Sequence, residues 1–258
     1  MSDFALVTGA SGGIGRSIAL TLAKRGYNLL LVSRSTTELE LLAETLKKDY
    51  SVQAVYYTAD LAGTKGIDEV VQWIKDLNYP LSILVNNAGF GLWGKFAELS
   101  LDTQLQMLRL NIDAVVSLSH QLLPLLSKQK QAYILNVAST AAYQAVPTLA
   151  LYSASKAAVL SFSRALRYEL RKGPVGVSCL CPGPTDTGFA KRAGMDKLAD
   201  LAEKFNMSPD EVANVAVKGL FAKKAEIIPG TLNKLSAFAV RLVSKSFVER
   251  IGGGLYEK

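Results

Sequence analysis

The sequence has little cysteine and histidine, with two Cys and one His among 258 residues. So few sulfur and imidazole ligands argue against a zinc site, any other metal centre and a disulfide framework. Cys179 and Cys181 are two residues apart in an apolar run, where alternate side chains point to opposite faces of a strand, and we expect no disulfide between them. His120 lies in an apolar helical stretch, where we expect it to have a structural role.

Long runs of one charge are also absent. The 29 Lys and Arg outnumber the 22 Asp and Glu, which gives a net charge of +7, but no five or six basic residues are consecutive. We therefore expect no nucleic-acid partner. A dispersed positive charge suits a phosphorylated ligand or an anionic membrane surface, and it is equally common in soluble basic proteins. An apolar run begins at Phe4 with no basic segment before it, so we expect no signal peptide and a cytoplasmic protein.

The chain alternates short apolar runs with longer amphipathic stretches. Its composition, 49% hydrophobic and 20% charged with 20 Gly and 8 Pro, is that of a folded protein and excludes disorder, collagen and coiled coil. The expected strands are Phe4–Thr8, Asn28–Ser33, Val52–Ala59, Leu81–Asn86, Tyr133–Ala138, Val175–Leu180 and Ala225–Ile228. The expected helices are Ile14–Arg25, Thr36–Lys48, Lys65–Leu77, Asp102–Lys128, Leu149–Arg171 and Pro209–Ala222. Gly26 and Gly173 follow basic residues and are expected to cap the helices before them.

This order predicts a single α/β domain spanning residues 1–258. Its core is expected to be a Rossmann-type, doubly wound parallel sheet of about seven strands with helices on both faces. Ligands of such sheets bind beyond the carboxyl ends of the strands, so the residues after each strand are the candidates for function.

Two segments interrupt the alternation. Residues 185–208 are placed to form a flap over a substrate. A surface insertion without such a role would show the same sequence features. The C-terminal extension, residues 232–258, begins with interleaved apolar and basic residues that are typical of an amphipathic helix. Such a helix could lie on a membrane surface, but charges interrupt it too often for it to span one, and we expect a packing helix or an oligomer contact.

A glycine-rich loop joins the first expected strand to the first expected helix. Glycines let the backbone approach a pyrophosphate, and the helix N-terminus supplies unpaired N–H groups with partial positive charge. A tight turn would also need glycines, and the spacing differs from the G-x-G-x-x-G dinucleotide pattern. The position at the start of the sheet favours phosphate binding. The loop residues expected to bind a cofactor are Gly9, Ser11, Gly12, Gly13, Ile14 and Gly15.

The second strand ends in Ser33-Arg34, where NAD-binding folds place a carboxylate for the ribose 2′-hydroxyl. A guanidinium there would instead hold a 2′-phosphate, with the serine hydroxyl as a second donor, so the sequence favours NADP(H) over NAD(H). The alternative to phosphate binding is that Arg34 is only a solvent-exposed residue of a loop.

The next two strands also end in polar residues that we expect to contact the cofactor. Asp60 is suited to accept a hydrogen bond from an adenine amino group, and Leu61 follows it. Asn86 and Asn87 can tie neighbouring strand ends together, although turn chemistry alone would also explain Asn and Gly in this place. The cofactor-binding candidates after the fourth strand are Asn87, Ala88 and Gly89.

Ser139 follows the fifth strand, and Tyr152 and Lys156 lie four residues apart on one face of the next expected helix. A nearby ammonium favours the phenolate and lowers the pKa of a tyrosine from about 10 toward neutrality. The phenol can then exchange a proton with a carbonyl/alcohol pair, while the serine hydroxyl stabilises the developing alkoxide.

Together these motifs resemble the short-chain dehydrogenase/reductase family, and in particular its bacterial NADP-dependent branch. The resemblance covers about residues 4–230 and shows no departure at a catalytic position. The matching residues are Thr8-Gly9-x-x-x-Gly13-x-Gly15, Asp60, Asn86-Asn87-Ala88-Gly89, Asn111, Ser139, Tyr152-x-x-x-Lys156 and Pro182-Gly183-Pro184-Thr185-Asp186-Thr187.

The resemblance implies a role for each residue. Tyr152 would be the catalytic acid and base, Lys156 would lower its pKa and bind the nicotinamide ribose, and Ser139 would polarise the carbonyl. Asn111 would hold a water in a proton relay behind the lysine. The nicotinamide would be lined by Pro182, Gly183, Thr185 and Thr187. Family members are commonly dimers or tetramers, which favours a homodimer or homotetramer here.

The substrate pocket is expected to be apolar. Its wall would contain Phe90, Leu92, Trp93, Ala141, Tyr143 and Val146, with Phe189 and Met195 from the flap. Such a wall suits a hydrophobic ketone or aldehyde, or the corresponding alcohol, as reactant. The sequence thus predicts an NADP(H)-dependent oxidoreductase. The alternatives are a non-catalytic NADP(H) sensor, against which the complete catalytic set argues, and a serine hydrolase, against which the lack of a G-x-S-x-G motif around Ser139 argues.

Overall fold

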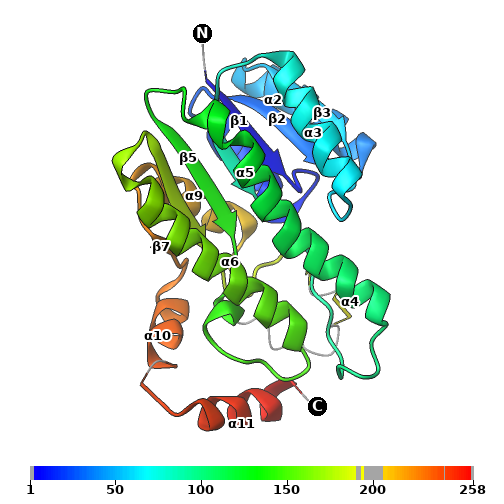
Figure 1. Cartoon of the computed structure of the whole chain (residues 1–258), viewed down its shortest axis with the longest axis vertical. Coiled ribbons are helices and arrows are strands. Elements are labelled where there is room, and N and C mark those ends of the chain that lie inside the picture. Colours follow the sequence, from blue (N-terminus) through cyan, green and yellow to red (C-terminus); the bar gives the residue numbers. More distant parts are fainter. Residues whose placement is uncertain (1–2, 190–192, 195–205, 241, 257–258) are drawn as a thin grey trace.

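The computed structural model describes residues 3–189, 193–194, 206–240 and 242–256. Seven parallel strands form one sheet in the order β3-β2-β1-β4-β5-β6-β7 (Figure 1). The strands are β1 (Phe4–Thr8), β2 (Asn28–Ser33), β3 (Ala54–Thr58), β4 (Leu81–Asn86), β5 (Ala132–Val137), β6 (Val175–Leu180) and β7 (Glu226–Ile227). The predicted Rossmann-type sheet is therefore confirmed, and its strand order reverses direction between β1 and β4, where such folds bind ligands.

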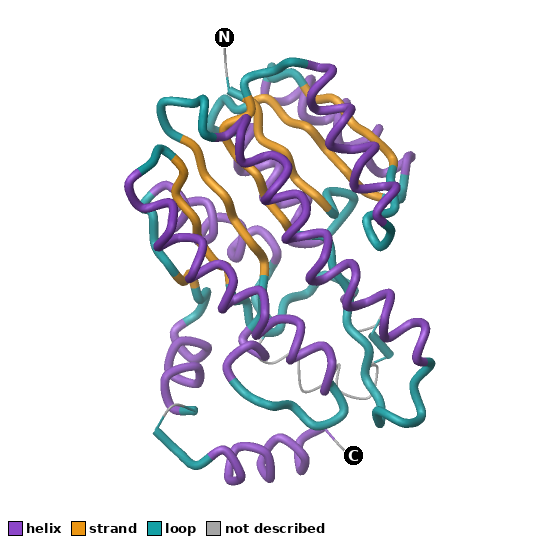
Figure 2. Tube along the Cα trace, in the orientation of Figure 1, coloured by secondary structure: helices purple, strands orange, loops and turns teal. Residues whose placement is uncertain are grey.

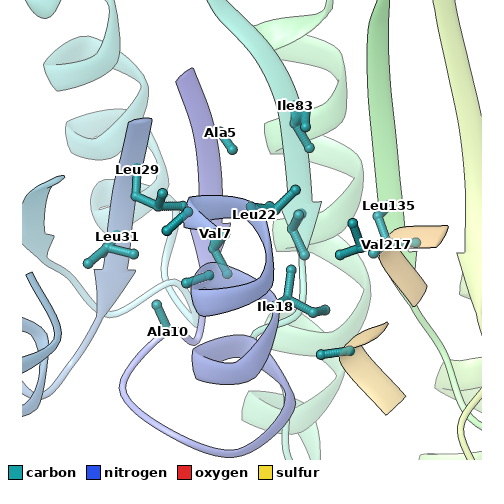
Figure 3. Packing of buried hydrophobic residues seen from close by; sticks show 14 of the residues in the cluster. Ala5, Val7, Ala10, Ile18, Leu22, Leu29, Leu31, Ile83, Leu135 and Val217 are labelled. Atoms are coloured by element: carbon teal, nitrogen blue, oxygen red, sulfur yellow. The ribbon is translucent and has the colours of Figure 1, made fainter. Parts of the chain in front are cut away.

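Helices cover both faces of the sheet (Figure 2). One face packs against α1 (Gly13–Ala23), α2 (Thr36–Tyr50) and α9 (Pro209–Phe221). The other packs against α3 (Thr64–Leu77), α5 (Ala114–Leu126) and α6 (Ala150–Glu169). Figure 3 shows Ile18 and Leu22 of α1 seated on β1 and its neighbours, and both side chains are fully buried. Each such burial stabilises the fold by about 1.5–3 kcal/mol.

The helix expected over residues 102–128 contains a π-helical turn. The structure has α4 (Leu101–Leu108), a π-helical turn (Arg109–Asp113) and α5, with the N–H of Ala114 bonded to the carbonyl of Arg109. The expected helix is thus confirmed as one helical run, and what the apolar pattern does not predict is the π-helical turn inside it. The turn contains Asn111, whose side chain is completely buried.

Three further expectations need correction. Cys179 and Cys181 lie on the same face of β6, since side chains two apart on a strand share a face; both thiols are free, with their Sγ atoms 3.9 Å apart. His120 is exposed on α5 and is not a core residue. Gly26 ends α1 with φ +84°, as a glycine cap does, whereas Gly173 ends its helical segment with φ −102°, which does not require glycine.

A row of buried polar side chains crosses the sheet between β4 and β5. Asn86 and Asn136 are partners in the strand register. The Asn86 amide donates to Asn136 Oδ1 at 2.8 Å and to Ser119 Oγ at 3.0 Å, and the Asn136 amide donates to Ser163 Oγ at 2.9 Å. The expectation that the asparagines tie strand ends together is thus confirmed for Asn86.

The tail after β7 forms α10 (Thr231–Ala239) and α11 (Lys245–Tyr256), beyond the carboxyl ends of the strands (Figure 1). The first of these corresponds to the expected amphipathic helix, but its orientation does not fit ordinary packing. Leu232, Leu235 and Phe238 are each at least 60% exposed. Among the described helices, none is both long enough and apolar enough to cross a membrane.

Candidate active site

The glycine loop has the geometry of an anion site. Gly9 and Gly13 have φ values of +65° and +53°, which favour glycine. Gly12 precedes α1 with no side-chain cap, and the described first turn carries no acidic residue, so its N–H groups are available to an anion. A cleft of about 410 Å³ opens beside this turn and is bounded by Gly13, Arg16, Ser17, Asp186, Thr187, Gly188, Pro209 and Asp210. Ser11 and Ile14 are half-buried in the loop.

Close packing against the backbone leaves no room for a side chain at Gly15. A Cβ on Gly15 would lie 2.4 Å from both the Gly9 carbonyl oxygen and Asn87 Nδ2, whereas a Cβ on Gly12 would meet nothing within 4 Å. We expect Gly15→Ala to lower the free energy of unfolding by about 1–3 kcal/mol. The matched Gly12→Ala variant should leave it nearly unchanged. Urea unfolding of both variants tests the packing; equal stabilities would contradict it.

Hydrogen bonds between β1 and the segment after β4 hold this loop in place. Thr8 Oγ1 accepts from the backbone N–H groups of Asn87 and Ala88, both at 3.0 Å. The Asn87 amide donates to the carbonyls of Thr8 at 2.9 Å and Gly9 at 3.2 Å. The Asn87 side chain therefore positions the glycine loop, and Gly89 lies farther along the same segment.

At the end of β2, Arg34 is exposed and forms no salt bridge with any described residue. The backbone N–H of Ala10 bonds to the carbonyl of Val32, so the glycine loop is held next to this strand end. The Ser33 hydroxyl is engaged with the backbone of Ser35. A guanidinium at this place can reach solvent and an anion bound at the loop.

The end of β3 lies beside this strand end. Asp60 is exposed and accepts a hydrogen bond from the N–H of Ala62 at 3.0 Å. Leu61, the other predicted cofactor contact here, is only 3% exposed and packs in the core. Its side chain is therefore hardly accessible to a ligand.

Tyr152 and Lys156 come together on α6 as the spacing predicts. The Lys156 Nζ lies 5.8 Å from the centre of the Tyr152 ring and donates to the Val137 carbonyl at 3.0 Å, at the end of β5. Ser139 follows two residues later and its Oγ accepts from the N–H of Ala141 at 3.1 Å. No acceptor among the described residues takes the Ser139 hydroxyl proton, which leaves this hydroxyl able to donate to a substrate oxygen.

Asn111 has its side chain fully engaged. Its Oδ1 accepts from the N–H of Phe90 at 3.1 Å, and its Nδ2 donates to the Phe90 carbonyl at 3.0 Å and to Ser155 Oγ at 3.1 Å. The side chain therefore fixes the segment after β4, and a proton-relay role for this residue stays a prediction. Ser155, which donates to the Tyr152 carbonyl at 2.7 Å, was missed because a serine on a helix has no distinguishing pattern.

Burial controls the charge of Lys156, which is 5% exposed. Removal from water lowers its pKa from 10.5 to about 8. A Cβ on Gly89 would lie 3.4 Å from its Nζ and 2.9 Å from Asn111 Oδ1, so these groups converge around the segment after β4. The lysine can thus be protonated or neutral near physiological pH.

The buried ammonium should cost stability. Below pH about 8 the lysine is charged in both folded and unfolded states, and its burial costs about 3 kcal/mol; between pH 8 and 10.5 the folded state loses the proton first and this cost disappears. Allowing about 1 kcal/mol for the lost hydrogen bond to Val137, Lys156→Met should raise the free energy of unfolding by about 2 kcal/mol at pH 7. Urea unfolding measures the difference, which should change sign and reach about −1 kcal/mol above pH 10.5, where only the lost hydrogen bond remains; a pH-independent difference would contradict it.

Apolar side chains surround Tyr152, which is part of a buried cluster that we call the pocket cluster. The cluster contains Met107, Val146 and Leu149, with Phe90, Leu92, Trp93, Ala141, Leu151 and Phe189 packed against it. Six of the predicted wall residues are therefore brought together, while Met195 lies outside the described residues. Tyr143 is elsewhere: its hydroxyl donates to Glu226 at 2.6 Å, so its assignment to the wall was wrong. Met107, Leu149 and Leu151 were missed because they look like ordinary core residues.

The described parts of residues 185–208 contact this cluster, while their role as a flap stays a prediction. The Phe189 ring lies 5.5 Å from the Tyr152 ring, and the Ala193 carbonyl accepts from the N–H of Trp93 at 3.0 Å. A Cβ on Gly13 would lie 2.9 Å from Thr187 Cβ, so the flap begins against the glycine loop.

The segment after β6 lies between the glycine loop and the tail. Pro182 is buried, and its carbonyl accepts from the N–H of Thr140. Thr185 Oγ1 donates to the Gly183 carbonyl at 3.0 Å. A Cβ on Gly183 would meet the Asn233 side chain at 2.4 Å. Asn233 of α10 was missed because nothing in the tail sequence indicates that it reaches this segment.

The sequence and the fold are similar to those of known oxidoreductases. The family model described as short chain dehydrogenase matches residues 3–230. The chain is 34% identical to the ketoacyl reductase HetN of Nostoc sp. over 255 residues, covering 95% of this chain and 86% of that protein. A short-chain dehydrogenase from Sphingobium yanoikuyae in complex with NADPH has a TM-score of 0.83 at 27% identity and 93% coverage of both chains.

A second solved structure is similar. The bulky-bulky ketone specific alcohol dehydrogenase from Comamonas testosteroni has a TM-score of 0.78 at 27% identity, again with 93% of both chains covered. The fold and site thus define an oxidoreductase with a dinucleotide-binding sheet. The chain belongs to the short-chain dehydrogenase/reductase family, which confirms the resemblance seen in its motifs.

Proposed function

We propose that the protein is an NADP(H)-dependent oxidoreductase that interconverts a hydrophobic ketone or aldehyde and its alcohol. The observation that carries this proposal is the convergence of Tyr152, Lys156 and Ser139 at the sheet edge that also carries the open glycine loop. The ketoacyl, ketone-specific and NADPH-bound relatives support the same class of reaction.

The residues present fit a phosphorylated dinucleotide. The uncapped first turn of α1 suits a pyrophosphate, and exposed Arg34 without a carboxylate at the end of β2 suits a 2′-phosphate. The segment after β6, with Pro182, Gly183, Thr185 and Thr187, would hold the nicotinamide. When bound, the nicotinamide supplies or accepts the hydride.

The side chains of this chain would handle the proton and the developing charge. In the reducing direction the Ser139 hydroxyl donates a hydrogen bond to the carbonyl oxygen and orients it. The Tyr152 hydroxyl donates its proton as that oxygen becomes an alcohol. The Lys156 ammonium stabilises the resulting phenolate, and the apolar pocket excludes water around it. In the oxidising direction each proton movement is reversed.

We also propose that the enzyme acts in the cytoplasm as a homodimer or homotetramer. Leu101 and Leu105 on α4 and Val116 on α5 are each at least 40% exposed, and they offer an apolar helical surface to a second copy. Light scattering of the purified protein measures its oligomeric state, and a monomer at all concentrations would contradict this part.

The experiment that tests the function is a titration of the purified protein with NADPH and with NADH. The second step follows the loss of nicotinamide absorbance with a panel of hydrophobic ketones and aldehydes. Tight NADPH binding with turnover on a panel member supports the proposal. No binding of either cofactor, or binding without turnover across the panel, counts against it.

A further inference from the structure

The tail presents an apolar surface to solvent. We call this the tail surface, formed by the outward side chains of residues 232–240 and 242–251. Its members are Leu232 (66% exposed), Leu235 (60%), Phe238 (60%), Leu242 (72%), Val243 (42%), Phe247 (53%) and Ile251 (50%). So many exposed large apolar side chains in one segment of the chain are typical of an interaction site.

The orientation of α10 is the reverse of that expected in a soluble protein. It packs inward with small or polar residues, since Ala237 is 5% exposed and Asn233 lies against Gly183. Leu232 and Leu235 face outward one turn apart. A surface helix normally turns its apolar side to the core. The outward apolar face of α10 therefore indicates a binding surface.

The charge of the tail narrows the choice of partner. Residues 231–256 contain Lys234, Arg241, Lys245 and Arg250 but only one carboxylate, Glu249, a net charge of 4 − 1 = +3. Lys234, Lys245 and Arg250 are exposed among the apolar side chains. A two-fold contact with a second copy would bring two such positive surfaces together, which disfavours self-association.

We propose that the tail surface lies on an anionic membrane surface, with α10 and α11 in the plane of the interface. The apolar side chains would enter the acyl boundary while the lysines and arginines meet lipid phosphates. Both helices lie at one end of the molecule, away from β2 and β3 (Figures 1 and 2).

The inner side of α11 lies close to the pocket cluster around Tyr152. A Cβ on Gly252 of α11 would lie 3.3 Å from Pro147, which follows Val146 of the pocket cluster. Resting on the proposed function, this position gives the pocket access to a carbonyl compound dissolved in the bilayer. The substrate class is then a membrane-resident, long-chain or polycyclic carbonyl compound rather than a water-soluble one.

The test is co-sedimentation of the full chain with vesicles, without substrate or cofactor. Vesicles of phosphatidylcholine and phosphatidylglycerol in equal parts should bind the protein, and pure phosphatidylcholine should bind it roughly tenfold less. The double variant Leu235→Ser/Phe238→Ser should lose roughly tenfold or more of the binding. The matched control Leu41→Ser/Tyr168→Ser changes large side chains of similar exposure, 58% and 66%, and should bind as the unchanged chain does.

Several outcomes would overturn the proposal. One is that the chain stays in the supernatant with anionic vesicles; another is that the tail and control variants lose binding equally. If light scattering shows that the tail variant converts a dimer to a monomer while vesicle binding is unchanged, the tail surface is a contact between copies. Because Tyr152→Phe should bind vesicles normally, failure of membrane binding is distinguishable from failure of catalysis.

A kinetic comparison tests the access to substrate. With NADPH, the tail variant should turn over a ketone dissolved in anionic vesicles several-fold more slowly than the unchanged chain does. Its turnover of a water-soluble ketone should not change. An equal loss of turnover on both ketones would contradict the access route. The membrane contact itself is tested separately, by the sedimentation experiment.

Discussion

Replacing Tyr152 by phenylalanine is expected to lower turnover about a thousandfold while NADPH affinity changes little. The hydroxyl is the proton donor in the proposed reaction, whereas the ring packs on Phe189 and should keep its place. Steady-state rates and an NADPH titration of the same preparation separate the two effects. The urea midpoint of the variant shows that its fold is intact.

Tyr143→Phe is the matched control for this prediction. It removes the same hydroxyl from a tyrosine on the turn after β5, but that hydroxyl is bonded to Glu226 and points away from the pocket cluster. Its turnover should stay within a few-fold of the unchanged enzyme. If the two variants lost activity equally, the assignment of Tyr152 as acid and base would be wrong.

Replacing Arg34 by aspartate should weaken NADPH binding about a hundredfold and leave NADH binding unchanged or improved. The guanidinium would make charge-assisted hydrogen bonds to a 2′-phosphate worth about 1.5–3 kcal/mol, and a carboxylate there would repel that phosphate while accepting from a ribose hydroxyl. Fluorescence titration with both cofactors measures the change.

Lys24→Asp provides the control for charge. Lys24 is exposed just after α1, at the opposite end of that helix from the glycine loop, and its replacement alters the net charge by the same two units. Both cofactors should keep their affinity in this variant. If both variants lost NADPH affinity equally, the cause would be the change in the protein's net charge and not the loss of a contact between Arg34 and the 2′-phosphate.

The sheet could be predicted because its pattern is local. All seven strands were expected, and β1, β2, β4 and β6 have the predicted bounds. Strands buried on both faces form continuous apolar runs that turns interrupt clearly. The pair Tyr152 and Lys156 was likewise predictable, since spacing on one helix fixes which side chains adjoin.

The remaining features depend on contacts between distant segments. The π-helical turn at Asn111 is accompanied by hydrogen bonds to Phe90 and Ser155, which no local pattern records. The placement of Asn233 against Gly183 and the outward face of α10 are likewise products of tertiary packing. Tyr143 was misplaced because position along the chain does not reveal which way a turn directs its side chain.

The asparagine row between β4 and β5 has a consequence for folding. These strands are joined through the crossover of residues 87–131, so they must find each other after a long segment has formed. An all-apolar pair of strands would tolerate several alignments with similar energies. A shift of one residue would separate Asn86 from Asn136 and leave buried amides without partners, at about 1–3 kcal/mol for each. The two asparagines therefore fix the register between β4 and β5. Misaligned intermediates are less stable and short-lived, and the two halves of the sheet pair in a single alignment.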